Sequence, residues 1–336
     1  MEGFYDTPAG RVPQIKDSLA LRDHWGSVRC RIGLRTDYTV QPGLYRLGGA
    51  GADSPVVITA NYKLTFDTVR ASLRGVDCWL LIVDTDGINV WCAGGKGRFT
   101  AEGIAEIVRA SGLERVVSHR ELVLPQLSAN GVSANALWKL CGFKGGFGPI
   151  RAEDIAPYLA HGADESMRWV TFTLAERLVL APLEVALALK WVALVCGVGF
   201  VLSGIGPEIF SLSAAWQRGL LVVYATLTGL LVGALATPAL LPWLPGRSFA
   251  FKGAVAGLVA ALVVLAPLAW GRASLLEYAI LVTWATVWSS YMCMNFTGST
   301  PFTSPTGVER EMRRAIPWQL GAIMLSIAAW IAVPFF

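Results

Sequence analysis

The second half of the chain contains five long apolar runs, which limit its fold more than any other feature. The centre of each run carries no charged residue, and each run is long enough, or nearly so, to cross a hydrocarbon layer, which takes about 20 apolar residues. We expect transmembrane helices at residues 185–207, 219–241, 253–271, 275–294 and 317–336. The sequence therefore predicts an all-α membrane domain of five helices over residues 191–336, preceded by an amphipathic linker at 169–190.

The charged residues indicate a different kind of structure in the first half. Of the 28 Lys and Arg residues 20 precede residue 178, as do 19 of the 24 Asp and Glu residues. Residues 1–168 are therefore expected to form a globular domain, and the rest to lie in membrane lipid. The net charge of +4 is small and evenly mixed, so nucleic acid is not an expected partner.

Loop charges predict the orientation of the membrane domain. The first residues lack a basic stretch followed by an apolar run, so no cleaved signal peptide is expected and the globular domain should be cytoplasmic. The loops that would then face the cytoplasm carry Arg247, Lys252, Arg310, Arg313 and Arg314, whereas the outer loops carry Arg218 and Arg272. This bias predicts a multi-pass protein of the cytoplasmic (inner) membrane with its C-terminus outside.

The long loop at residues 295–316 allows two interpretations. The first is a polar connection that closes a helix hairpin. The second is a surface that contacts the globular domain or a partner, which is considered because so long a loop between spans is uncommon. Thr306 and Glu309 have the spacing of a capping box and predict a short basic helix that begins there.

The globular half alternates short apolar segments with helical ones. We expect strands at residues 55–62, 78–84, 115–119 and 146–150, a strand or loop at 121–127, and helices at 65–74, 100–112, 133–142 and 153–160. This order is typical of βαβ units and predicts an α/β fold with a largely parallel sheet. Ligands of such sheets bind beyond the carboxyl ends of the strands. Residues 1–54 are expected only to extend this domain.

The glycine-rich segment at residues 86–97 fails the common motif tests. Gly97 follows Lys96 where a P-loop needs Ser or Thr, and the glycines lack the spacing of a dinucleotide fingerprint. On residue type alone, Cys92 is more often a buried structural thiol than a ligand. The six cysteines include no C-x-x-C pair, so we expect no zinc site and no iron–sulfur cluster built by the chain itself.

Residues 89–96, Asn-Val-Trp-Cys-Ala-Gly-Gly-Lys, resemble the cap-helix signature of the HgcA family of mercury-methylating membrane corrinoid proteins. That family is related to the large subunit of the corrinoid iron–sulfur protein of the acetyl-CoA pathway. The likeness runs from about residue 55 and extends to His119, Pro125–Leu127, Gly142–Phe143, Gly148–Pro149, Arg151 and residues 295–314. It implies a Rossmann-like corrinoid-binding domain with a cap helix, followed by five membrane spans.

The resemblance also implies a site. A cobalamin-type corrinoid is the expected cofactor, and Cys92 would be both the catalytic residue and the lower axial ligand of its cobalt. The motif D-x-H-x-x-G, which supplies a histidine ligand in other corrinoid domains, is absent. Asn89 would donate a hydrogen bond to the sulfur, and Gly94, Gly95 and Gly97 would allow close approach to the ring. The expected corrinoid-binding residues are Thr59, Ala60, Asn61, Asn89, Val90, Trp91, Cys92, Ala93, Gly94, Gly95, Lys96, His119 and Gln126.

The reaction that the resemblance implies is methyl transfer from cobalt to Hg(II). A donating thiolate favours departure of the methyl group with its electron pair, which suits a soft electrophile. Methyltetrahydrofolate, or its methyltransferase, is the expected methyl donor, and a ferredoxin-like iron–sulfur protein of the HgcB type the expected electron donor. Two alternatives remain: a membrane corrinoid methyl carrier of the acetyl-CoA pathway type that serves another acceptor, and a non-enzymatic membrane scaffold.

Overall fold

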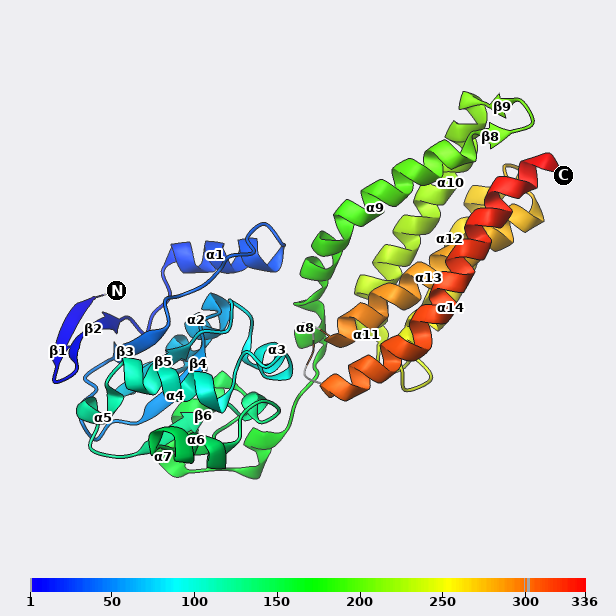
Figure 1. Ribbon diagram of the computed structural model, residues 1–336. Coiled ribbons are helices and arrows are strands. Elements are labelled where there is room, and N and C mark those ends of the chain that lie inside the picture. The colour runs from blue at the N-terminus through cyan, green and yellow to red at the C-terminus, as the bar shows by residue number, and fades with distance from the viewer. Residues whose placement is uncertain (1, 299, 301–302) are drawn as a thin grey trace. The chain divides into compact units, whose positions relative to one another are not determined.

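The computed structural model describes residues 2–298, 300 and 303–336, and the chain divides into two compact units. The first comprises residues 1–30 and 34–171, and the second comprises residues 31–33 and 172–336. Figure 1 labels most of the helices and strands of each unit.

The first unit is built on a seven-stranded sheet with the order β1-β2-β3-β5-β4-β6-β7. The strands β5 (Cys78–Val83), β4 (Val56–Ala60), β6 (Glu121–Leu124) and β7 (Lys144–Phe147) run parallel to one another. Their carboxyl ends therefore meet at one edge of the sheet. The predicted α/β class and largely parallel arrangement are confirmed for this half of the sheet.

Residues 2–54 extend the sheet beyond β5 in a different pattern. β3 (Gly43–Leu47) pairs antiparallel with β5, β2 (Gly10–Ile15) pairs parallel with β3, and β1 (Gly3–Thr7) forms a hairpin with β2. The helix α1 (Leu21–Arg31) lies between β2 and β3 in the sequence. These residues thus belong to the same sheet, as expected, and they make it mixed.

Two helical layers cover the parallel strands. Residues of α3 (Val90–Gly95), α4 (Ala101–Ala110) and α6 (Ala134–Cys141) pack in one core cluster with alternate strand residues such as Ile58 and Leu81. α2 (Lys63–Ser72) and α7 (Ile155–His161) pack in the other cluster, with Val57 and Leu80. Successive side chains of a strand point to opposite faces of the sheet, so each buried strand contributes residues to both core clusters.

The strand expected at residues 115–119 is wrong. Residues Leu113–Val116 form the short helix α5, which begins after Gly112 in a left-handed conformation (φ +61°). Leu113, Val116 and Val117 bury their side chains in the core from this turn, so their apolar character reflects burial and not pairing in the sheet.

Four helices of the second unit are long and apolar enough to cross a membrane: Leu174–Ser203, Leu212–Leu240, Phe249–Ala269 and Thr306–Phe335. These stretches contain α8 (Leu174–Leu178) with α9 (Ala181–Ser203), α10 (Leu212–Leu231) with a π-turn (Val232–Ala236) and α11 (Thr237–Leu240), α12 (Phe249–Ala269), and most of α14 (Pro305–Ala332).

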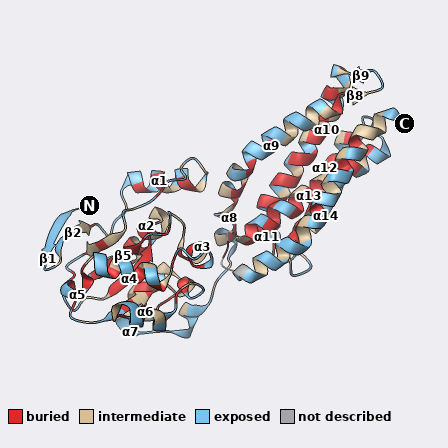
Figure 2. Ribbon diagram, in the orientation of Figure 1, coloured by how far each residue is buried: buried red, intermediate tan, exposed pale blue. Residues whose placement is uncertain are grey.

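The fifth expected span is α13 (Leu275–Gly298), which does not meet the same test of composition among the described residues. It packs against α10, α12 and α14, and Figure 2 shows its many buried residues. Its polar side chains bond inside the bundle: Ser289 Oγ donates to the carbonyl of Gly253 at 2.7 Å, and Ser290 Oγ to that of Ala250 at 2.9 Å. An enclosed helix needs less apolar surface than one exposed to lipid, which accounts for the difference.

Close packing of α12 on α13 depends on two glycines spaced four residues apart. A Cβ atom at Gly253 would lie 2.6 Å from the carbonyl oxygen of Ser289, and one at Gly257 would lie 2.5 Å from Cβ of Ser289. Such small-xxx-small pairs let helix backbones approach closely in membranes.

The predicted capping box at Thr306 is also wrong. Ser304 caps the last helix, where its hydroxyl accepts a hydrogen bond from the N–H of Gly307 at 3.2 Å. The basic segment and the last span form one continuous helix, α14, and α13 extends to Gly298, so the connection is shorter than residues 295–316. Residues 299, 301 and 302 of that segment lie outside the described residues.

Arg218, which was expected in an outer loop, lies in α10 with its side chain only 11% exposed. Its Nε contacts Glu277 Oε1 of α13 at 2.7 Å, and its terminal nitrogens donate to the carbonyls of Ser203 at 3.1 Å and Trp330 at 2.6 Å. One guanidinium therefore joins α9, α10, α13 and α14. Pairing of this kind is what allows a charge to lie within a helical membrane bundle.

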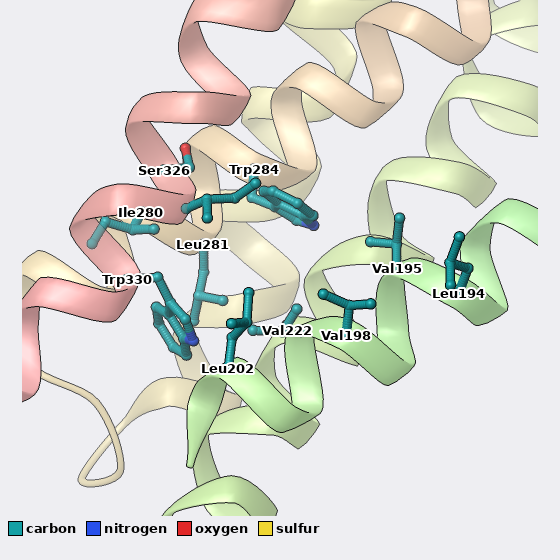
Figure 3. A pocket seen from close by; sticks show the side chains of 12 residues that line it. Leu194, Val195, Val198, Leu202, Val222, Ile280, Leu281, Trp284, Ser326 and Trp330 are labelled. Carbon is teal, nitrogen blue, oxygen red and sulfur yellow. The ribbon is translucent and has the colours of Figure 1, made fainter. Parts of the chain in front are cut away.

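An apolar cavity of about 220 Å³ lies among the same four helices. Figure 3 shows side chains from α9, α10, α13 and α14 around it, including Trp284 and Trp330.

Candidate functional site

The cap helix α3 begins directly after the loop that leaves the carboxyl end of β5. Asn89 is its N-cap residue, and its Oδ1 accepts a hydrogen bond from the backbone N–H of Cys92 at 2.9 Å. Val90 and Ala93 are buried in the core beneath the helix. The N-cap bond and the burial of Val90 and Ala93 therefore fix the helical turn that carries Cys92.

The buried side of α3 packs on the loop that follows β6. A Cβ atom at Gly94 would lie 2.2 Å from Oδ1 of Asn130, and one at Gly131 would lie 2.7 Å from Cα of Gly94. Asn130 Nδ2 also donates to the carbonyl of Trp91 at 3.3 Å. Gly94 thus packs the cap helix against the protein, and its expected approach to a ring stays a prediction.

The other side of α3 is open. Gly95 and Lys96 are exposed, and Cys92, one helical turn before them, is partly buried. Residues three and four apart share a helix face, so the thiol, the bare glycine backbone and the ammonium group lie on one surface. Gly95 brings no side chain to this surface, and a flat ligand requires such a bare position.

Burial raises the pKa of the Cys92 thiol above its ordinary value, while a hydrogen bond from Asn89 and the charge of Lys96 act to lower it. The free thiol is therefore largely protonated at neutral pH. A soft metal ion placed over the sulfur would displace the proton and bind the thiolate. The expected donation from Asn89 to the sulfur stays a prediction, and the bond that the structure shows between the two residues runs from the N–H of Cys92 to Asn89 Oδ1 at 2.9 Å.

Asn61 organises the loop that leads into the cap helix. Its Oδ1 accepts hydrogen bonds from the N–H and hydroxyl of Thr85 and from the N–H of Gly87, at 2.8 to 3.1 Å, and its Nδ2 donates to Asp84 at 2.8 Å. The side chain is only 5% exposed. Asn61 therefore positions the segment between β5 and α3, and it is a support of the site more than a contact surface.

The remaining expected residues fall in different places. Thr59 and Ala60 are fully buried in β4, and Thr59 Oγ1 has no hydrogen-bond partner among the described residues. Gln126 follows β6 at the carboxyl edge, in a 3₁₀ turn that contacts α3. His119 precedes β6 and contacts the carbonyl of Ser54, which precedes β4, at 3.0 Å. It therefore lies at the amino edge, separated from the cap helix by the length of the strands.

Three supporting residues were not predicted: Thr85, Asn130 and Gly131. Thr85 lies two residues past the end of a buried strand, and Asn130-Gly131 is a common turn pair, so the sequence contained a signal for all three residues. Among the described residues, no group of three or more His, Cys, Asp or Glu side chains could hold a metal ion, and all six cysteines are free thiols.

The helix α3 and Cys92 lie within a segment of the chain that is similar to known proteins. Residues 29–139 match the family model described as the delta subunit of CO dehydrogenase/acetyl-CoA synthase. Similar curated proteins include the gamma subunits of the acetyl-CoA decarbonylase/synthase complexes of Methanopyrus kandleri (40% identity over 97 residues), Methanosarcina acetivorans (42% over 99) and Archaeoglobus fulgidus (40% over 97). Each match covers 28% of this chain and 21% of the relative, so the chain spans about a fifth of the length of those proteins. The relationship to subunits of acetyl-CoA synthesis that the motif indicated is confirmed for this segment.

Proposed function

We propose that this chain is a corrinoid-dependent methyltransferase that carries a methyl group on cobalt and transfers it to Hg(II), with Cys92 as the lower axial ligand. The observation that carries the proposal is the open face of α3, where the Cys92 thiol is presented beside the exposed Gly95 at the carboxyl edge of the parallel strands. The surrounding segment matches subunits of acetyl-CoA synthase, and the cap-helix motif that it contains implies a corrinoid carrier by its resemblance.

The residues of the chain fit such a group. The open face offers a soft sulfur ligand with the bare backbone of Gly95 one turn along, and the N-cap bond that Asn89 Oδ1 accepts from the N–H of Cys92 fixes the turn that carries it. When bound, the corrinoid supplies a cobalt centre that can carry a methyl group, and a thiolate below it favours transfer toward a soft electrophile. Asn89 and Lys96 assist by stabilising the charge that forms on sulfur when the proton leaves.

The proposal includes partners and a location. A ferredoxin-like iron–sulfur protein of the HgcB type would supply electrons, and methyltetrahydrofolate or its methyltransferase would supply the methyl group. The four apolar helices support a multi-pass protein of the cytoplasmic membrane. We propose that the corrinoid domain faces the cytoplasm and the C-terminus the outside, following the loop charges.

A second candidate is a membrane corrinoid carrier that serves an acceptor of acetyl-CoA synthesis. It is favoured by the names of the curated relatives, which are subunits of acetyl-CoA decarbonylase/synthase complexes. Both candidates require the same ligand at Cys92 and differ only in the acceptor. A scaffold without a corrinoid is separated from both by the failure of the purified chain to bind cobalamin.

The test uses the full chain, reconstituted with cobalamin in detergent. We expect Cys92→Ala to change the optical spectrum of the bound cobalt and to abolish methyl transfer to Hg(II). Cys92→His should retain binding but slow transfer, because neutral imidazole donates less charge than thiolate. Cys141→Ala is the matched control, since that thiol is also partly buried and donates to the carbonyl of Leu137 at 3.3 Å on α6. Unchanged spectrum and activity in Cys92→Ala would contradict the assignment.

A further inference from the structure

The second unit contains another cavity, of about 580 Å³, between the start of α12 and the first half of α14. It combines aromatic and charged lining residues, unlike the apolar cavity of Figure 3. Three of the residues that line it are Arg247, just before the N-cap of α12, and Arg310 and Arg314, which are one turn apart on α14. The cavity therefore gathers guanidinium groups from two helices at one end of the unit.

These three arginines make no ion pair or side-chain hydrogen bond within the part of the chain that the structure describes. The carboxylates close to them are engaged elsewhere. Glu309 pairs with Arg313 at 2.6 Å, and Glu311 Oε1 accepts the backbone N–H of Ala250 at 2.6 Å, at the start of α12. The three guanidinium groups therefore give the cavity a positive charge that Glu309 and Glu311 do not pair with.

The cavity also has an unused hydrogen-bond acceptor among its lining residues. Gln319 is only 7% exposed, and its Nε2 donates to Ser290 Oγ at 2.9 Å. The Ser290 hydroxyl donates in turn to the carbonyl of Ala250, so it can only accept from Gln319, and this fixes the orientation of the amide. Gln319 Oε1 is left without a partner in the described chain. A buried acceptor of this kind favours a ligand that brings a hydroxyl or bound water.

We propose that this cavity binds the headgroup of an anionic membrane phospholipid. Guanidinium groups match phosphate oxygens in geometry and charge, and basic pockets between membrane helices are suited to lipid headgroups. Trp318 is 82% exposed and Phe251 is 53% exposed beside the arginines, so the cavity lies where aromatic side chains meet the headgroup region. A soluble phosphate would use the arginines alone, whereas a lipid also uses the apolar rim.

Native mass spectrometry of the full chain in neutral detergent tests the proposal, with phosphatidylglycerol and phosphatidylcholine of identical acyl chains as probes. We expect the wild type to bind phosphatidylglycerol more tightly. Each charge removed should weaken binding about fivefold, so Arg310→Gln with Arg314→Gln should weaken it roughly 25-fold. Arg313→Gln is the matched control, because Arg313 lies on the same helix, is 79% exposed and already pairs with Glu309.

Three results would overturn the proposal: equal binding of the two lipids, an equal loss in Arg313→Gln, or competition by inorganic phosphate at the concentration of the lipid. The last would assign the cavity to a soluble anion. Arg310 and Arg314 are exposed, so the variant that lacks both should have the wild-type melting temperature in the absence of lipid. A loss of affinity for phosphatidylglycerol in this variant then reports on the cavity and not on unfolding.

Discussion

Gly95→Leu is the sharpest test of how a corrinoid would meet the cap helix. Gly95 is exposed and follows Cys92 by three residues, so a side chain there would stand on the open face beside the sulfur. Gly95 is exposed in the protein without a ligand. The substitution should leave the free protein as stable as the wild type or slightly more so, because glycine in a helix is about 0.8–1.0 kcal/mol less favourable than alanine, and leucine is close to alanine.

With a corrinoid bound, the same side chain would occupy the space of the ring. Extra bulk in a fitted contact costs about 1–3 kcal/mol, which corresponds to roughly a 5- to 150-fold loss of affinity. The predicted signature is therefore a divergence: unchanged or higher melting temperature of the free protein, and weaker binding of cobalamin.

An optical titration of the full chain with cobalamin measures the affinity, and a thermal melt of the free chain measures the stability. Arg98→Leu is the control, because it adds the same side chain just past the helix, where Arg98 forms only an exposed ion pair with Asp86. If Gly95→Leu binds as tightly as the wild type, the ring does not lie over this face and the role of Cys92 must be reassigned.

Four further outcomes are expected. Gly94→Ala should destabilise the attachment of the cap helix by about 1–3 kcal/mol, seen as faster hydrogen exchange in α3, because its Cβ would lie 2.2 Å from a side-chain oxygen. The affinity of cobalt for the Cys92 sulfur should rise with pH, by up to about tenfold per pH unit below the raised pKa of the thiol, because ligation releases its proton. An affinity that does not change with pH would exclude the thiolate as the ligand. Asp23→Asn should cost about 1.5–3 kcal/mol of stability, measured by thermal unfolding above pH 4, because it removes one of the two carboxylates that pair with Lys63 and Arg70 and leaves both cations on Asp67 alone. Burial raises the pKa of Asp23, but hydrogen bonds and the charges of its two cations bring it down to about 2, so the wild type should lose this stabilisation as pH falls from about 4 toward 2. An impermeant thiol reagent should label a cysteine placed at Ser211 and miss one at Ser304 in intact cells, and the reverse would invert the topology.

The parallel half of the sheet and the position of the cap helix could be predicted because both depend on local patterns. Buried strands such as residues 78–83 are continuous apolar runs, and the motif at 89–96 is specific by itself. The sequence could not predict which side of α3 packs against the protein, because Gly94 contacts Asn130, which lies 36 residues further along the chain.

Long-range pairing explains the other differences. The antiparallel insertion of β3 next to β5 depends on contacts between residues more than 30 positions apart, which no local pattern encodes. His119 is adjacent in sequence to β6, but only the strand direction reveals that it lies at the amino edge. The polarity of α13 is explained by its enclosure, which is a property of the assembled bundle.

The contacts of Arg218 have a consequence for biosynthesis. Its helix is made before α13 and α14, so the guanidinium reaches the carbonyl of Ser203 first, then Glu277, and gains the carbonyl of Trp330 only when the last helix has been inserted. Until then one terminal nitrogen of the guanidinium lacks the acceptor that it has in the finished protein. We therefore expect a chain stopped before Trp330 to lack this last link, whereas in the finished chain one side chain joins four helices.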